Sequence, residues 1–312
     1  MSAALELVGV AHDFPVRGRT LRAVDGVDLA VGAGETLGVV GESGCGKSTL
    51  ARIMLKLTRP SEGRVRLLGE DVTDLMESAM RPRRRHLQAV FQDPVSSLNP
   101  RLTVRDIVAE SLRPLGLRRT AMSQRVLSML EMVGLPADAA GRYPHAFSGG
   151  QRQRIAIARA LAAEPRVLVC DEATSALDVS VQAQILNLLA DLQEQLGLAV
   201  VFISHNLGAV RHVSHRVAVM YLGRIVEQGP EAAIFDQPAH PYTKALLAAV
   251  PDPAPGAAVP APLHGEVPSP LDRPPGCHLH PRCPRTAPRC ATEAPPLVEF
   301  APGHQVRCFY PG

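Results

Sequence analysis

The first part of the chain alternates between apolar and polar residues and then passes into a short, wholly apolar run. Val8–Phe14 and Ala23–Val31 show the β-rich alternation of strands, and Gly32–Gly34 predicts a turn. Thr36–Val40 is an apolar run of the kind that forms a buried parallel strand. Ser48–Leu57, which follows after a glycine-rich loop, has the spacing of a helix. We expect a small antiparallel β part followed by a strand, a loop and a helix.

Helical spacing dominates the middle of the chain, and strand signals return after it. We expect a helical insertion near residues 93–160. Apolar runs at Val167–Cys170 and Ala199–Ile203 predict two further strands, and Val181–Leu196 between them has helical periodicity. Alternating β and α elements predict an α/β fold with a parallel sheet and covering helices.

The composition changes abruptly after Val250. Pro251–Pro262 is rich in proline and alanine and predicts an extended linker, and a tail rich in cysteine, proline, arginine and histidine follows. We therefore expect one large domain over residues 1–250 and an extension over residues 251–312.

The bulk composition excludes several classes of protein. With 312 residues, 46% of them hydrophobic and 20% charged, the chain can bury a core. A net charge of +3, without a basic stripe interleaved with aromatics, argues against a nucleic-acid partner, and we interpret the basic run Arg81–Arg85 as a solvated face or turn. No apolar stretch approaches the roughly 18–20 residues that span a bilayer, and Met1–Phe14 does not resemble a signal peptide. We expect a cytosolic chain, held by a partner if it works at a membrane.

The glycine loop after Thr36–Val40 fits the phosphate-binding pattern G-x-x-x-x-G-K-[ST] at every required position. Its glycines let backbone N–H groups converge on phosphate oxygens, and the next helix points its positive end at the same anion. We expect Lys47 to reach the β- and γ-phosphates and the Ser48 hydroxyl to bind Mg²⁺. The alternative is a chance glycine turn, and the strand and helix around the loop argue against it.

A pair of carboxylates ends the predicted strand Val167–Cys170. Asp171 can hold the Mg²⁺ shell, and Glu172 can polarise an attacking water. Taken alone, such a strand is more often followed by a solvated acidic turn. Since the phosphate loop belongs to the same predicted sheet, we favour the catalytic interpretation.

Phe147–Gln151 marks the start of another predicted helix, which begins at Ser148 and runs to Ala163. Ser148 is a good N-cap, and the two glycines after it expose N–H groups that suit a γ-phosphate, although a simple capped helix has the same pattern. Ser-Gly-Gly-Gln, placed between the phosphate loop and the acidic pair, resembles the signature of the ATP-binding-cassette (ABC) ATPases. Phe147, where that family commonly has leucine, is a mild departure.

This resemblance implies roles for residues that no local pattern would single out. Gln92 matches the Q-loop glutamine, which senses Mg²⁺ and the lytic water and contacts the permeases, and His205 resembles the switch histidine at the γ-phosphate. Phe14 resembles the aromatic residue that stacks on adenine, and Ser175–Asp178 resembles the D-loop. The implied catalytic residues are Glu172, His205 and Gln92, the implied Mg²⁺ ligands are Ser48, Gln92 and Asp171, and the implied ATP contacts are Phe14, Gly41, Glu42, Ser43, Gly44, Cys45, Gly46, Lys47, Ser48, Thr49, Ser148, Gly149, Gly150, Gln151 and Asp178.

Longer segments narrow the resemblance to one group of importers. Val40–Arg52, Phe91–Arg101 and Tyr143–Arg154 are similar to the ATPase subunits of oligopeptide and dipeptide ABC importers, and so are His240–Thr243 and Gly265–Leu271 in the tail. The resemblance covers nearly the whole chain, and the cysteine in the phosphate loop resembles the second of the two ATPases. It implies ATP hydrolysis coupled to peptide import, with ATP held between two ATPase subunits. The implied further partners are two membrane permeases and, indirectly, an extracytoplasmic solute-binding protein.

The resemblance also implies a place at the cytoplasmic face of the membrane, attached through the permeases. Close relatives carry nickel or other solutes, which remain alternative substrates. A soluble ABC protein of translation or DNA repair usually has two cassettes or a long coiled-coil insertion, and this chain has neither. A regulatory protein that binds ATP without hydrolysing it is disfavoured by Glu172 and His205.

Four of the six cysteines crowd the C-terminal end. Their spacing does not match the paired Cys-x₂-Cys knuckles of common zinc sites, and a reducing compartment favours a metal over disulfides. Gly276–Pro284 resembles the Cys-rich extension of the peptide-importer ATPases, some of which bind a [4Fe–4S] cluster. We expect such a cluster first, zinc with help from His278 and His280 second, and a disulfide third; free thiols are the remaining alternative. The four residues are Cys277, Cys283, Cys290 and Cys308.

Overall fold

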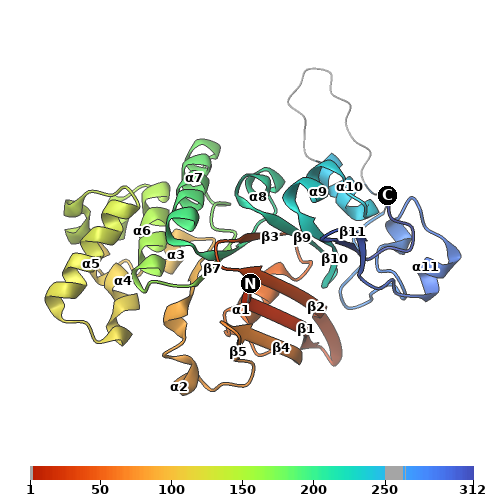
Figure 1. The fold of residues 1–312 in the computed structure, drawn as a ribbon, viewed down its shortest axis with the longest axis horizontal. Coiled ribbons are helices and arrows are strands. Elements are labelled where there is room, and N and C mark those ends of the chain that lie inside the picture. The colour runs from red at the N-terminus through yellow and green to blue at the C-terminus, as the bar shows by residue number, and fades with distance from the viewer. Residues whose placement is uncertain (1–2, 250–262, 264) are drawn as a thin grey trace.

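The computed structural model describes residues 3–249, 263 and 265–312, so the expected linker at 251–262 lies outside the described residues. In the part of the chain that it describes, the strands form a four-stranded and an eight-stranded sheet (Figure 1). A lobe of helices lies beside the larger sheet, and the C-terminal tail lies at its other end.

The four-stranded sheet is the antiparallel part expected at the N-terminus. β1 (Ala3–Val16) lies between β2 (Arg19–Gly32) and β4 (Glu62–Leu67), and β5 (Glu70–Asp71) pairs with β4 at the edge. β1 and β2 extend beyond the predicted strands at both ends, since their hairpin pairing continues to Val16 and Arg19.

The eight-stranded sheet contains a run of parallel strands. Their order is β9 (Arg216–Tyr221), β3 (Thr36–Val40), β8 (Ala199–Ile203), β7 (Val167–Asp171) and β6 (Leu87–Val90). The predictions for β3 and β8 are confirmed to the residue, and every residue in both strands is buried, as expected of strands covered on both faces. Since the carboxyl ends of parallel strands meet at one edge, the loops after these strands leave the sheet together.

Helices cover the sheet and form the lobe. α1 (Lys47–Met54) follows β3, and α7 (Val179–Leu196) precedes β8. The expected helical insertion is confirmed, because α4 (Val104–Ala109), α5 (Arg119–Met132) and α6 (Gly149–Ala162) pack together as the lobe (Figure 1). No helix in the described ranges has the length and apolar character needed to cross a membrane. The remaining helices are α2 (Glu77–Met80), α3 (Pro94–Ser97), α8 (Leu207–Val213), α9 (Glu231–Asp236), α10 (Pro241–Ala248) and α11 (Pro288–Thr292), with 3₁₀ turns at Arg84–His86, Glu110–Leu115, Ala137–Gly141, Pro144–Ala146 and His280–Arg282.

The C-terminal tail completes the larger sheet. β10 (Arg224–Pro230) pairs antiparallel with β9, β12 (His304–Val306) pairs with β10, and β11 (Val298–Ala301) lies outermost.

A buried polar cluster anchors this junction. The Glu227 carboxylate lies 2.8 Å from His304 Nε2 and accepts hydrogen bonds from the N–H groups of Ala239 and His240. Glu227 is 0% exposed and His304 3%. Loss of His304 would take a hydrogen-bond partner from the buried carboxylate, at a cost of about 1–3 kcal/mol, so the cluster helps to fix the tail on the core.

Candidate functional site

A cavity of about 260 Å³ lies where the phosphate loop leaves β3. Phe14, Ser43 to Thr49 of the loop, and Glu172 all line it, together with the Leu222–Gly223 turn after β9. A larger cavity, of about 440 Å³, lies between the helical lobe and the opposite ends of the strands, and none of the predicted site residues lines it. The smaller cavity is therefore the candidate site.

The phosphate loop fixes its lysine by main-chain contacts. Lys47 Nζ donates hydrogen bonds to the carbonyl oxygens of Gly41 (2.7 Å) and Glu42 (2.9 Å), and the residue is 5% exposed. A Cβ at Gly41 would lie 2.2 Å from the carbonyl oxygen of Met220, and one at Gly46 would lie 2.3 Å from that of Ala23. Both positions therefore require glycine. Carbonyl oxygens hold the ammonium group without neutralising its charge, which leaves it able to bind a phosphate.

Residues distant in the sequence support the loop from behind. The Glu42 N–H donates a 2.9 Å hydrogen bond to the Tyr242 hydroxyl, which lies 200 positions away. The Glu42 carboxylate lies 3.2 Å from the Arg282 guanidinium, and Gly223 N–H donates to Cys45 O at 2.8 Å. Tyr242 belongs to His240–Thr243, a segment similar to the importer group, but no local pattern in the sequence indicates its contact with the loop.

Replacing Tyr242 with phenylalanine should loosen the loop. The Glu42 N–H would lose its partner, at a cost of about 1 kcal/mol for a partly buried group. We expect a lower unfolding temperature and a few-fold weaker ATP binding. Tyr143→Phe is the matched control, because Tyr143 is 44% exposed and outside the site. Equal stability and ATP affinity in Tyr242→Phe and the wild type would contradict a supporting role for the hydroxyl.

The acidic pair lies at the carboxyl end of β7. Glu172 has a positive φ of 50°, and its N–H donates to Ile203 O on the neighbouring β8 at 2.9 Å. Such a backbone costs of order 1–3 kcal/mol and persists only where the surroundings enforce it. Glu172 Oε1 lies 3.3 Å from Nδ1 of His205, which follows β8, so the carboxylate and the histidine act as neighbours across two strands.

Asp171 has an unusual environment for a carboxyl group. Burial, and then the charge of Glu172, raise its pKa above the ordinary value. Within the described ranges, no group hydrogen-bonds to its buried Oδ1. An acceptor of this kind, at the same sheet edge as Ser48, fits the shell of a Mg²⁺ ion bound with a phosphate.

The signature segment begins α6 as predicted. The Gln151 N–H donates to Ser148 Oγ at 3.3 Å, and the Ser148 N–H donates to Gln151 Oε1 at 3.0 Å, which confirms Ser148 as the N-cap. A Cβ at Gly150 would lie 2.4 Å from Val181 Cγ1, so α6 packs closely on α7. Ser148 and Gly149 are exposed, and of the described residues that line the cavity none belongs to this segment.

The structure therefore divides the predicted residues into two groups. Phe14, the phosphate loop and Glu172 line one cavity, with His205 in contact with Glu172. Gln92 and Asp178 are exposed and, like the signature, do not contribute to that cavity in the described part of the chain. One chain therefore brings together only part of the predicted site, and the signature, Gln92 and Asp178 lie outside its cavity.

The expected metal centre in the tail is not supported. Each of the six cysteines, all of them in described residues, has a free thiol, and no described group of three or more His, Cys, Asp or Glu residues is arranged to hold a metal ion. Burial raises the pKa of the Cys277 thiol to about 11 and also raises those of Cys283 and Cys308. The unsupported ligand set is Cys277, Cys283, Cys290 and Cys308.

Known protein families match both the large domain and the C-terminal part of the chain. A family model described as "ABC transporter" matches residues 24–175, and one described as "Oligopeptide/dipeptide transporter, C-terminal region" matches residues 226–290. The chain is 55% identical over 290 residues to the "Probable peptide ABC transporter ATP-binding protein y4tS" of Sinorhizobium fredii, covering 92% of this chain and 82% of that protein. It is 50% identical over 295 residues to the "Oligopeptide transport ATP-binding protein OppF" of Salmonella typhimurium, covering 93% and 88%. The solved dimer of the ATP-binding cassette MJ0796 bound to ADP and Pi is similar with a TM-score of 0.66 and 31% identity, covering 73% of this chain and 98% of that one.

Proposed function

Because the chain belongs to the family of ABC transporter ATP-binding proteins, we propose that it is the ATP-hydrolysing subunit that energises peptide import by a membrane complex. The observation that carries this proposal is the cavity that joins Lys47 and Ser48 of the phosphate loop to Glu172. The match of the tail to the oligopeptide/dipeptide transporter region supports peptides as the solute, with nickel or another solute as the alternative.

The residues in the cavity account for hydrolysis. Lys47 and the loop N–H groups bind the phosphates of ATP, aided by the positive end of α1. Mg²⁺, when bound, would be held by Ser48, Gln92 and Asp171 and would neutralise phosphate charge. Glu172 accepts a proton from water as the water oxygen bonds to the γ-phosphorus. The bond between that phosphorus and the β–γ bridging oxygen breaks, and ADP and phosphate are released.

His205 acts on this step through Glu172. At 3.3 Å from Oε1, its ring fixes the orientation of the carboxylate. It is also 58% exposed at the open side of the site, where it can reach the γ-phosphate of ATP held between two subunits.

The exposed signature supports a second ABC ATPase subunit as partner. Ser148 and Asp178 are exposed away from the cavity of their own chain, and the adjacent Val179 is 82% exposed. In our proposal, ATP binds between the phosphate loop of one subunit and the signature of the other, identical or different.

The remaining partners are two membrane permeases and, indirectly, an extracytoplasmic solute-binding protein. Gln92 is exposed after β6 and suits contact with a permease. This assembly would hold the chain at the cytoplasmic face of the membrane. The [4Fe–4S] cluster and zinc stay outside the proposal, because no group of three or more His, Cys, Asp or Glu side chains among the described residues is placed to hold a metal ion.

Reconstitution tests the proposal. The chain would be co-expressed with its candidate permeases and a second ATPase, purified as a complex and placed in proteoliposomes. We expect co-purification, and ATP-dependent uptake of labelled peptide with matched ATP hydrolysis. If the complex took up nickel but no peptide, nickel would be the transported solute. ATP hydrolysis without binding to any permease would favour a non-transport ABC protein and overturn the proposal.

A further inference from the structure

Two residues of the C-terminal tail line the candidate nucleotide cavity. Pro270 and Arg273 lie in its wall together with Phe14 and Lys47. No motif in the sequence of this tail points to the nucleotide site. A cavity wall contributed from so far along the chain requires an anchor that fixes the tail at that point.

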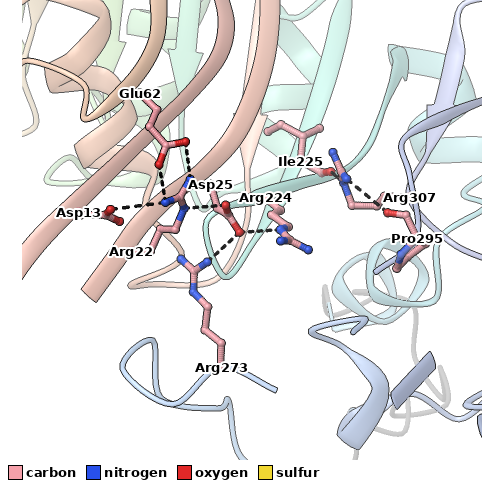
Figure 2. A network of polar contacts seen from close by, with 9 residues as sticks. All are labelled: Asp13, Arg22, Asp25, Glu62, Arg224, Ile225, Arg273, Pro295 and Arg307. Carbon is pink, nitrogen blue, oxygen red and sulfur yellow. Dashed lines mark hydrogen bonds and ion pairs between the residues drawn. The ribbon is translucent and has the colours of Figure 1, made fainter. Parts of the chain in front are cut away.

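The anchor of Arg273 is a shared carboxylate on β2. Arg273 Nη1 lies 3.0 Å from Asp25 Oδ2, and both side chains are 13% exposed. Asp25 also accepts hydrogen bonds from Arg22 Nε and Arg224 Nε, each at 2.7 Å. Figure 2 shows the three arginines converging on this aspartate from the N-terminal sheet, the start of β10 and the tail.

Short contacts connect this anchor to the phosphate loop. Asp25 N–H donates to Gly223 O at 2.8 Å, and Gly223 N–H donates to Cys45 O at 2.8 Å. A Cβ at Gly223 would lie 2.7 Å from Nη2 of Arg273, so the guanidinium lies directly against this turn. Two backbone hydrogen bonds and one ion pair therefore fix the position of Arg273 relative to the loop.

The same contacts place Arg273 towards the Phe14 end of the cavity. Phe14 pairs with Leu21, and Asp13 with Arg22, in the β1–β2 register. Arg22 is therefore next to the partner of Phe14, and it shares Asp25 with Arg273. Phe14 is the residue expected to stack on the base, so Arg273 lies at the nucleoside end.

Arg273 has donor capacity that its protein contacts do not use. A guanidinium carries five N–H donors. Within the described residues, Nη1 donates to Asp25 and the buried Nε has no partner, while Nη2 has no hydrogen bond to the protein and is the donor left for a ligand. Arg224 and Arg273 share the single carboxylate of Asp25, so positive charge remains at this wall.

We propose that Arg273 is a nucleotide-binding residue: its N–H donors contact the base or ribose of a bound nucleoside triphosphate, and Pro270 closes the same wall. This inference rests on the proposed function, in which ATP binds this cavity. Docking of the tail and binding of nucleotide are then thermodynamically linked, since each stabilises the arrangement that the other requires.

Calorimetry with two ligands tests the inference on the full-length chain. Tripolyphosphate offers phosphates without a nucleoside, and ATP offers both. Arg273→Ala should weaken ATP binding about tenfold, as expected for loss of a hydrogen bond from a charged donor, and leave tripolyphosphate binding unchanged. Arg273→Lys should recover part of the ATP affinity. Arg285→Ala, an exposed tail arginine outside the cavity, should match the wild type.

The outcomes separate this inference from the proposed function. Unchanged ATP affinity in Arg273→Ala, or an equal loss for ATP and tripolyphosphate, would overturn the contact with the nucleoside. Thermal unfolding of each variant would show whether the tail has detached from the core. If Arg273→Ala is destabilised in this way, the ATP and tripolyphosphate affinities of a normally folded Arg273→Lys protein take its place in the test. If Lys47→Ala binds both ligands as the wild type does, the cavity is not a phosphate site and the proposed function itself fails.

Discussion

The Glu172→Gln protein should bind ATP about as well as the wild type and hydrolyse it roughly a thousandfold more slowly, as expected for removal of a general base. Glutamine keeps the size of the side chain but cannot accept the proton of the attacking water. Single-turnover phosphate release in the assembled complex, beside equilibrium ATP binding, measures the two effects separately. Glu194→Gln, an exposed carboxylate on α7, is the matched control.

The local structure makes Glu172→Gln a clean substitution. The positive φ at this position is held by the backbone bond to Ile203, which the substitution retains. The contact with His205 changes from a carboxylate to an amide at the same place. Folding should therefore be unaffected, and near-normal turnover in the variant would remove Glu172 from its role.

Lys47→Ala should weaken ATP binding roughly a hundredfold and abolish transport, since it removes a charged donor to the phosphates. The ammonium group is buried among the carbonyl groups of the loop, and no other loop residue supplies a side-chain cation. Part of the effect will come from the carbonyl oxygens of Gly41 and Glu42, which lose their donor.

Titration of ATP and uptake in proteoliposomes measure the two effects of Lys47→Ala. Lys244→Ala, which removes an exposed lysine of α10, should match the wild type in both assays. Because the lysine faces the phosphates in our proposal, tripolyphosphate binding should weaken together with ATP binding. An unchanged ATP affinity would contradict the identification of the phosphate loop.

The best predictions of the fold came from wholly apolar runs. Thr36–Val40 and Ala199–Ile203 coincide with β3 and β8, because strands buried on both faces leave no place for a polar residue. The predicted helix Ser48–Leu57 was too long at its end. α1 stops at Met54, where Lys56 adopts a positive φ of 54° and Leu57 N–H bonds back to Arg52 O. That ending is a C-cap geometry, and its sequence here carries no glycine to reveal it.

The tail shows where local patterns mislead. The crowding of four cysteines and the family resemblance suggested a metal cluster, but the described residues form no metal-binding group. The features that hold the tail on the core are Glu227 with His304, and Arg273 with Asp25. Each pair joins residues far apart in the sequence, so neither had a motif by which to be found.

The sequence by itself determined the phosphate loop, its strand and helix, and the N-cap Ser148, since each depends on residues within a few positions of one another. The structure alone decided which distant residues complete the cavity. Tyr242 supports the loop and Arg273 lines the cavity, because α10 brings Tyr242 to Glu42 and the tail brings Arg273 to Asp25. Contacts over such separations depend on how the chain packs in three dimensions, and no periodicity along the chain encodes them.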